Sequence, residues 1–179
     1  MLQKCSIFDV AGVFFNEPTK DHYLIEISRK ANLAHTSVKK YLKILKNKNI
    51  IKQRIEKRGS RNFPFFMANI NTKEYKEHKK IYNLIKIRQS KLIVYLKDKI
   101  MPRSIVLFGS YFKGEDIEDS DIDVFIEANE EILDLSTFEK KLKRKIQLHF
   151  KENFNKYPKE LKNNIINGIV LHGYLEVFK

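Results

Sequence analysis

Two aspartates separated by one residue, Asp121 and Asp123, are the residues of this chain whose type and spacing most directly suggest chemistry. They lie in residues 120–126, a largely β-branched and apolar run that predicts a strand, on which residues two apart point to the same face. Two carboxylates about 6–7 Å apart along a strand repel each other unless a cation lies between them. Because hard oxygen ligands suit Mg²⁺ or Mn²⁺, we expect a divalent-cation site here.

A second motif, Gly109-Ser110, directly follows the buried-strand pattern of residues 104–108 and precedes Asp121 by ten intervening residues. Gly109 would let the backbone turn closely against a phosphate, and Ser110 would open a helix whose N–H groups face that anion. Lys113 would add positive charge near a triphosphate. Gly109, Ser110 and Lys113 are therefore candidate nucleotide-binding residues.

The combined pattern, Gly-Ser, ten residues and then Asp-x-Asp, resembles the signature of the minimal nucleotidyltransferases of the DNA polymerase beta superfamily. The resemblance covers about residues 100–175 and includes Gly114. It implies an α/β domain with a mixed sheet flanked by helices, and Mg²⁺-dependent transfer of AMP from ATP to an acceptor hydroxyl. Minimal nucleotidyltransferases often act as antitoxins that adenylylate a partner toxin. A toxin, another protein or a nucleic acid is therefore the expected acceptor.

The third carboxylate that active members of this family carry on a following strand has no counterpart here. Residues 145–150 form the corresponding strand pattern without an acid, so Gln147 or His149 occupies the expected place. A glutamine oxygen can ligate a cation but brings no charge, whereas a histidine can accept a proton near neutral pH. Two alternatives stay open. One is a working transferase with catalytic residues Asp121, Asp123 and Gln147; the other is an impaired domain that senses a nucleotide or contacts a protein.

Basic residues are concentrated in the front part of the chain. The formal net charge is +13, and residues 1–70 hold 14 Lys and Arg against 5 Asp and Glu, whereas residues 101–179 hold 12 against 14. A basic domain favours a polyanionic partner such as nucleic acid. Codon bias and solvated helix faces are the alternative explanation of so many lysines.

The front part also shows apolar residues at helical spacing in three stretches, residues 5–15, 24–31 and 35–46, with hydroxyl groups available to cap the third. Two strand-like runs, residues 50–56 and 62–68, follow around a glycine-containing basic tip. Three helices and then a hairpin is the order of a winged helix-turn-helix. Residues 34–51 resemble the recognition helix and first wing strand of archaeal and bacterial transcription regulators.

This second resemblance implies that residues 1–70 bind double-stranded DNA and regulate transcription, with the third helix in the major groove. Winged helices also serve as protein-contact modules, so a protein partner is the alternative. The residues expected to contact DNA are His35, Thr36, Ser37, Lys39, Lys40, Lys43 and Lys46 in the helix, and Arg58 and Arg61 in the wing.

We therefore predict two domains, an α+β winged helix-turn-helix over residues 1–70 and an α/β nucleotidyltransferase domain over residues 101–179. Residues 71–100 contain no Gly or Pro and predict a connecting helix, or two helices joined near Gln89-Ser90. This connector would either form a homodimer contact or pack one domain against the other. No run approaches the roughly 18–20 apolar residues of a membrane span, and no secretory signal is recognisable, so we expect a cytoplasmic protein without a membrane partner.

Overall fold

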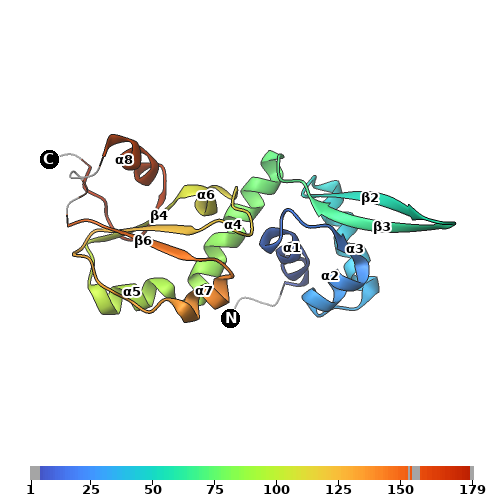
Figure 1. Ribbon diagram of the computed structural model, residues 1–179, viewed down its shortest axis with the longest axis horizontal. Helices are drawn as coiled ribbons and strands as arrows, with labels where there is room; N and C mark the ends of the chain where they lie inside the picture. Colours follow the sequence, from blue (N-terminus) through green and yellow to red (C-terminus); the bar gives the residue numbers. More distant parts are fainter. Residues whose placement is uncertain (1–4, 153, 155–157, 178–179) are drawn as a thin grey trace. The chain divides into compact units, whose positions relative to one another are not determined.

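The computed structural model describes residues 5–152, 154 and 158–177, and the chain divides into two compact units (Figure 1). The first unit is residues 1–82 and the second is residues 83–179. The side chains of Arg58 and Arg61 are outside the described part of the chain. None of the described helices is both long enough and apolar enough to cross a membrane.

In the part of the chain that the structure describes, the first unit contains three helices, a short strand and a long hairpin, followed by the start of α4. Its strands form an antiparallel sheet in the order β1-β3-β2. The three helices and the two hairpin strands expected from the sequence are present near the expected places, and a short strand, β1, was not expected. The elements are α1 (Ser6–Asn16), β1 (His22–Tyr23), α2 (Leu24–Ala31), α3 (His35–Asn47), β2 (Ile51–Arg58) and β3 (Arg61–Ala68).

The turn between α2 and α3 is set by Asn32, which adopts a left-handed conformation with φ of 53°. The Asn32 N–H bonds to the Arg29 carbonyl and the Leu33 N–H to the Ser28 carbonyl, so the last carbonyls of α2 are satisfied. The N-cap of α3 is Ala34, which makes no side-chain capping bond. The hydroxyl cap expected from the sequence is therefore wrong, because the helix begins at His35, before the hydroxyl residues.

Residues 71–100 do not form a separate connector. They contain α4 (Lys73–Ser90) and α5 (Leu92–Ile100), and the boundary between the two units falls inside α4. Tyr75 and Tyr82 are buried in the core of the first unit, whereas Leu92 and Leu96 are buried in the core of the second. The two-helix alternative is confirmed, since Lys91 has φ of 65° and interrupts the helical backbone.

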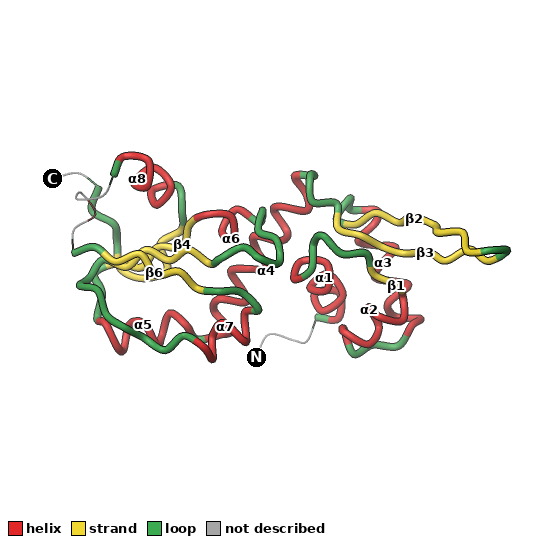
Figure 2. Tube along the Cα trace, in the orientation of Figure 1, coloured by secondary structure: helices red, strands yellow, loops and turns green. Residues whose placement is uncertain are grey.

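The second unit contains a mixed four-stranded sheet in the order β6-β5-β4-β7, with β5 parallel to β6 and the other pairs antiparallel. Figure 2 shows helices α5 and α7 on one side of strands β4 and β6 and α8 on the other. This arrangement agrees with the expected α/β domain. Its elements after α5 are β4 (Ser104–Phe108), α6 (Gly109–Lys113), β5 (Ile122–Ile126), α7 (Ser136–Leu142), β6 (Ile146–Phe150), α8 (Lys159–Ile166) and β7 (Ile169–Gly173).

Alternation along β4 and β5 divides this sheet into two buried faces. Leu107, Ile122 and Val124 pack in a cluster with residues of α4 and α5, while Phe108 and Phe125 pack in another with residues that include one from α8. Each fully buried side chain of this size stabilises the unit by about 1.5–3 kcal/mol. Both faces are therefore anchored, which holds the strand register and the residues at the strand ends in place.

Candidate active site

The candidate site lies where β4 ends and where β5 and β6 begin. Phe108 at the end of β4 lies opposite Asp123 of the antiparallel β5, and Asp123 lies opposite Gln147 of the parallel β6. Gly109 follows Phe108 directly and is the first residue of α6. The topology therefore brings the Gly-Ser turn, the Asp-x-Asp pair and Gln147 to one edge of the sheet.

Gly109 is packed against the carboxylate of Asp123. Its φ is 75°, in the region that favours glycine, and a Cβ on this residue would collide with Asp123 Oδ2. Both the backbone conformation and the close approach therefore require glycine at position 109. The Asp123 carboxylate is held directly beside the turn at which we expect nucleotide phosphates.

Asp121 lies one residue before β5, and its side chain is exposed. The strand predicted over residues 120–126 contains Asp123 as expected, but it begins at Ile122, so Ser120 and Asp121 precede it. The strand begins at Ile122 because the Ile122 N–H bonds to the Lys145 carbonyl at 2.8 Å, which starts the pairing with β6. Ile122 points into the core, as the alternation predicted.

The other two expected nucleotide-binding residues lie on α6, a helix of five residues. Ser110 is half-buried at its start, and Lys113 is exposed at its end. Tyr111 and Phe112 between them are buried in the core and fix the helix to the sheet. Ser110 and Lys113 are therefore presented from a rigid element.

A buried ion pair holds the acidic loop that follows α6. Arg144 Nη2 lies 3.3 Å from Asp116 Oδ2, and both side chains are almost fully buried. The Asn83 side-chain amide donates to Asp116 Oδ1 and to the Tyr111 carbonyl, each at 2.8 Å. The sequence carried no signal for this network, because Asp116 reads as one more acid of a solvated loop. The network ties α4, α6 and the segment between α7 and β6 around the loop that leads to Asp121.

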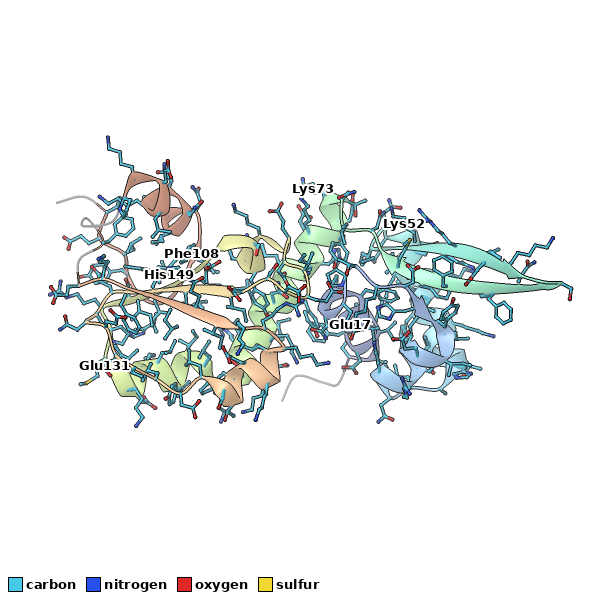
Figure 3. The ribbon with its side chains drawn as sticks, viewed as in Figure 1. Glu17, Lys52, Lys73, Phe108, Glu131 and His149 are labelled. Atoms are coloured by element: carbon cyan, nitrogen blue, oxygen red, sulfur yellow. The ribbon has the colours of Figure 1, made fainter. Side chains whose placement is uncertain are left out.

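His149 contacts the Asp-x-Asp pair directly. Its Nε2 lies 3.0 Å from Asp123 Oδ1, and its ring centre lies 5.1 Å from that of Phe108 (Figure 3). Gln147 is opposite Asp123 in the strand register, and its side chain is exposed. The sequence left open which of the two residues takes the place of the third carboxylate. His149 is the one with a side-chain contact to Asp123.

A cavity of about 540 Å³ lies beside Asp121, within the size range of ligand pockets. Basic side chains of Lys140, Lys143 and Lys145 line it together with acidic ones that include Glu139. The Ile146 N–H, which bonds to Glu139, lowers the pKa of this carboxyl, and Lys145 adds to the effect, so Glu139 stays ionised. The cavity is thus lined by side chains of both signs, and Lys145 pairs with Glu139 within it.

The residue types at this end of the sheet are those of a divalent-cation site. Asp121 and Asp123 supply carboxylate oxygens, the ligands preferred by Mg²⁺ and Mn²⁺. The Asp123 carboxylate occupies space that a side chain at position 109 would fill. The position opposite Asp123 on β6 holds Gln147, which adds no negative charge.

Comparison with known families agrees with this geometry. Residues 90–174 match the family model described as polymerase beta, nucleotidyltransferase. This part of the chain is similar to a nucleotidyltransferase domain. A 35-residue segment is 57% identical to a Methanocaldococcus jannaschii protein whose name describes it as a candidate protein adenylyltransferase. That match covers 20% of this chain and 35% of the relative, so the chain spans about a third of that protein. No solved structure matches the chain significantly.

The residues predicted to contact DNA lie outside this nucleotidyltransferase-like domain, on α3 and the hairpin of the first unit. Six of the seven residues on α3 are exposed, and Ser37 is half-buried. The inward face of the same helix carries Val38, Leu42 and Leu45, which are buried. The exposed residues are His35, Thr36, Lys39, Lys40, Lys43 and Lys46. Helix α3 therefore presents a basic face that its own unit does not bury.

A group of Glu17, His22 and Glu26 in the first unit also has the composition of a metal site. Their candidate ligand atoms lie within 4.8 Å of one another, and His22 is fully buried. Lys30 Nζ contacts both glutamates and already supplies a positive charge. Burial alone would raise the pKa of Glu17 and of Glu26, but hydrogen bonds from Lys30 lower both below the ordinary value. His22, Glu26 and Lys30 are spaced four residues apart, which places the three side chains on one helical face. This spacing is the sequence signal from which the cluster could have been predicted.

Proposed function

We propose that the second unit binds a divalent cation, Mg²⁺ or Mn²⁺, at Asp121 and Asp123 and transfers AMP from ATP to a hydroxyl of an acceptor. The observation that carries this proposal is the packing of the Asp123 carboxylate against Gly109. It couples the Gly-Ser turn to the Asp-x-Asp pair in space, and the family match over residues 90–174 supports the same activity.

In the proposed reaction, the acceptor hydroxyl releases its proton to solvent and its oxygen attacks the α-phosphorus, while the bond from that phosphorus to the leaving oxygen breaks and pyrophosphate departs. A bound cation would neutralise charge that develops on the phosphate oxygens. Asp121 and Asp123 would hold that cation. Gly109 leaves room for the Asp123 carboxylate beside the turn, Ser110 would bind the phosphates, and Lys113 would offset their charge. Gln147 would contribute a neutral oxygen at the position opposite Asp123.

A protein is the acceptor that we favour, because the name of the relative from Methanocaldococcus jannaschii describes it as a candidate protein adenylyltransferase. A toxin is one such protein, and a nucleic acid is the other class of acceptor. The experiment is incubation of the purified protein and fractions of a cell lysate with ATP labelled on the α-phosphate, in Mg²⁺ or Mn²⁺. Label should appear on an acceptor and be absent with the Asp121→Asn/Asp123→Asn variant. Absence of label from every fraction would contradict the proposed transfer.

A companion variant, Gln147→Asp, tests whether the neutral residue on β6 limits the reaction. Adding a carboxylate opposite Asp123 should raise the rate or tighten its dependence on Mg²⁺, because a two-metal site gains its missing charge. A large loss of activity would instead mean that Gln147 has a role of its own.

We further propose that the first unit is a winged helix-turn-helix that binds double-stranded DNA through α3. The order of three helices and a hairpin supports this assignment, as does the exposed basic face of α3. A fused DNA-binding unit would allow the protein to regulate transcription, including that of its own operon.

The second candidate function is a transcription regulator whose nucleotidyltransferase-like domain senses a nucleotide or contacts a protein without turnover. The observation that favours it is the uncharged Gln147 opposite Asp123, since a third carboxylate is missing there. Intact ATP binding without transfer of label to any acceptor would support this alternative.

A further inference from the structure

We propose that Glu17, His22 and Glu26 form a binding site for a transition-metal ion of the Zn²⁺ type, and that Lys30 competes with the metal for this site. The site lies in the first unit and does not depend on the cation site proposed for the second.

The three residues converge from successive elements of the first unit. Glu17 is the C-cap of α1, His22 lies on β1, and Glu26 lies in the first turn of α2 (Glu17 is labelled in Figure 3). One candidate ligand atom of each residue lies within 4.8 Å of the other two. Ligands bonded at about 2.0–2.2 Å in a tetrahedron around Zn²⁺ lie about 3.3 Å apart, so shifts of about 1.5 Å or less would close the site. The two glutamate side chains are 24% and 29% exposed, which leaves them space for such shifts.

The imidazole of His22 supplies a nitrogen that the protein leaves unsatisfied. His22 is fully buried, and its Nδ1 makes no hydrogen bond to any residue that the structure describes. Its Nε2 lies 3.4 Å from the Glu17 carbonyl oxygen. Because a carbonyl oxygen only accepts, this contact places the ring proton on Nε2 and leaves a lone pair on Nδ1. A histidine that ligates a metal through one nitrogen commonly donates its other N–H to a backbone carbonyl in this way.

The unsatisfied nitrogen lies next to a carboxylate. Nδ1 of His22 is 3.2 Å from Oε1 of Glu26, without the alignment of a hydrogen bond. Two acceptor atoms this close repel each other, and a buried polar atom without a partner costs stability. A cation bound to both atoms would remove both penalties.

Lys30 now provides a cation at this place. Its Nζ contacts Oε2 of Glu17 and the same Glu26 Oε1 that lies next to His22, yet it leaves Nδ1 unsatisfied. It brings one positive charge to two carboxylates, whereas a divalent ion would bring two and would also bind Nδ1. The Lys30 side chain is 31% exposed and has a flexible stem, so it can move into solvent when a metal replaces it.

The donor set selects the class of metal. An imidazole nitrogen suits Zn²⁺ and other transition metals, whereas Mg²⁺ and Ca²⁺ take oxygen ligands. Three protein ligands and one water complete a tetrahedral Zn²⁺ site. We therefore expect Zn²⁺ to bind, and Mg²⁺ not to displace it.

The test is titration of Zn²⁺ into full-length protein that carries Asp121→Asn/Asp123→Asn, so that the site proposed for the second unit cannot contribute. One equivalent should bind in the presence of Mg²⁺. Glu17→Gln and Glu26→Gln keep the shape of each side chain and should each weaken binding by at least about 10-fold. The matched control is Glu77→Gln, because Glu77 is an exposed glutamate of the first unit that also pairs with a lysine four residues away, and it should leave the affinity unchanged.

Lys30→Met distinguishes a metal site from a cluster of ion pairs. Removal of the competing ammonium should tighten Zn²⁺ binding by about 5- to 10-fold, since two ion pairs no longer have to be broken. In ¹⁵N spectra of labelled histidine, Zn²⁺ should shift Nδ1 of His22 while Nε2 keeps its proton.

Three results would overturn the inference. They are absence of Zn²⁺ binding, an affinity that both glutamine variants leave unchanged, and weaker binding by Lys30→Met. An Nδ1 signal that Zn²⁺ does not shift would overturn it as well. Each of these results would leave the proposed function standing, because the two aspartates are absent from the protein that is titrated.

Discussion

Gly109→Ala places a methyl group where Asp123 Oδ2 now lies, on a residue whose φ is 75°. The left-handed backbone costs a residue with a Cβ about 1–2 kcal/mol. The collision adds about 1–3 kcal/mol of overpacking, because relief requires Asp123 or α6 to move. The sum is a loss of about 2–5 kcal/mol in the stability of the second unit. Displacement of Asp123 should also weaken cation binding.

Gly59→Ala is the matched control for this substitution. Gly59 has a similar φ of 61°, but nothing lies within 4 Å of the position that its Cβ would take. It should therefore show only the backbone cost of about 1–2 kcal/mol. Unfolding in urea is monitored by amide hydrogen exchange, in β4 and β5 for Gly109→Ala and in β2 and β3 for Gly59→Ala. The affinity of both variants for Mn²⁺ is measured by titration.

A double-mutant cycle separates the collision from the backbone strain. Asp123→Ala removes the atom that the new methyl group meets, so Gly109→Ala should cost about 1–3 kcal/mol less in that background. Equal losses for Gly109→Ala and Gly59→Ala, with cation affinity unchanged in both, would refute the reasoning. The same holds if Asp123→Ala brings no relief.

Three further predictions concern the rest of the molecule. Replacing Lys39, Lys40 and Lys43 of α3 by alanine should weaken DNA binding, measured by fluorescence anisotropy. The slope of log affinity against log salt concentration should become smaller in magnitude by about 2–3. A triple replacement at Lys91, Lys97 and Lys99 should change neither quantity. Because the folded state lowers the pKa of Glu17, the ionised Glu17 carboxylate stabilises the protein above pH 4.5, and this stabilisation is lost as the pH falls below that value. Lys30→Met should remove this stabilisation, so the melting temperature should fall less steeply at acid pH. The variant should cost about 1 kcal/mol of stability near pH 7. Arg144→Met leaves the buried Asp116 carboxylate without its ion-pair partner and should destabilise the second unit by about 3–5 kcal/mol in urea, whereas adding Asp116→Asn should recover part of the loss.

The local parts of the site were predictable from the sequence. Ile122 and Val124 alternate with Asp123, and this period of two predicts the strand and the face of each side chain. The resemblance of the Gly-Ser and Asp-x-Asp motifs to those of the minimal nucleotidyltransferases implied that the two motifs belong to one site. Helical periodicity in the front part predicted α1, α2 and α3, because each has one apolar face.

Contacts between distant residues were not predictable in the same way. Asp116 and Arg144 are 28 residues apart, and Asp123 and His149 are 26 apart. Which side chains meet depends on strand register and on rotamers that the tertiary packing selects. The boundary inside α4 was missed for a related reason, since an amphipathic pattern shows that a helix has a buried face but not which core buries it.

The most direct test of the central claim uses ATP labelled on the α-phosphate and, in parallel, ATP labelled on the γ-phosphate, with the wild type and the Asp121→Asn/Asp123→Asn variant. Nucleotidyl transfer predicts that the α-label becomes attached to an acceptor while the γ-label leaves in pyrophosphate, and that both events are lost in the variant. Transfer of the γ-label, or an α-label on the acceptor that persists without the two aspartates, would contradict the account.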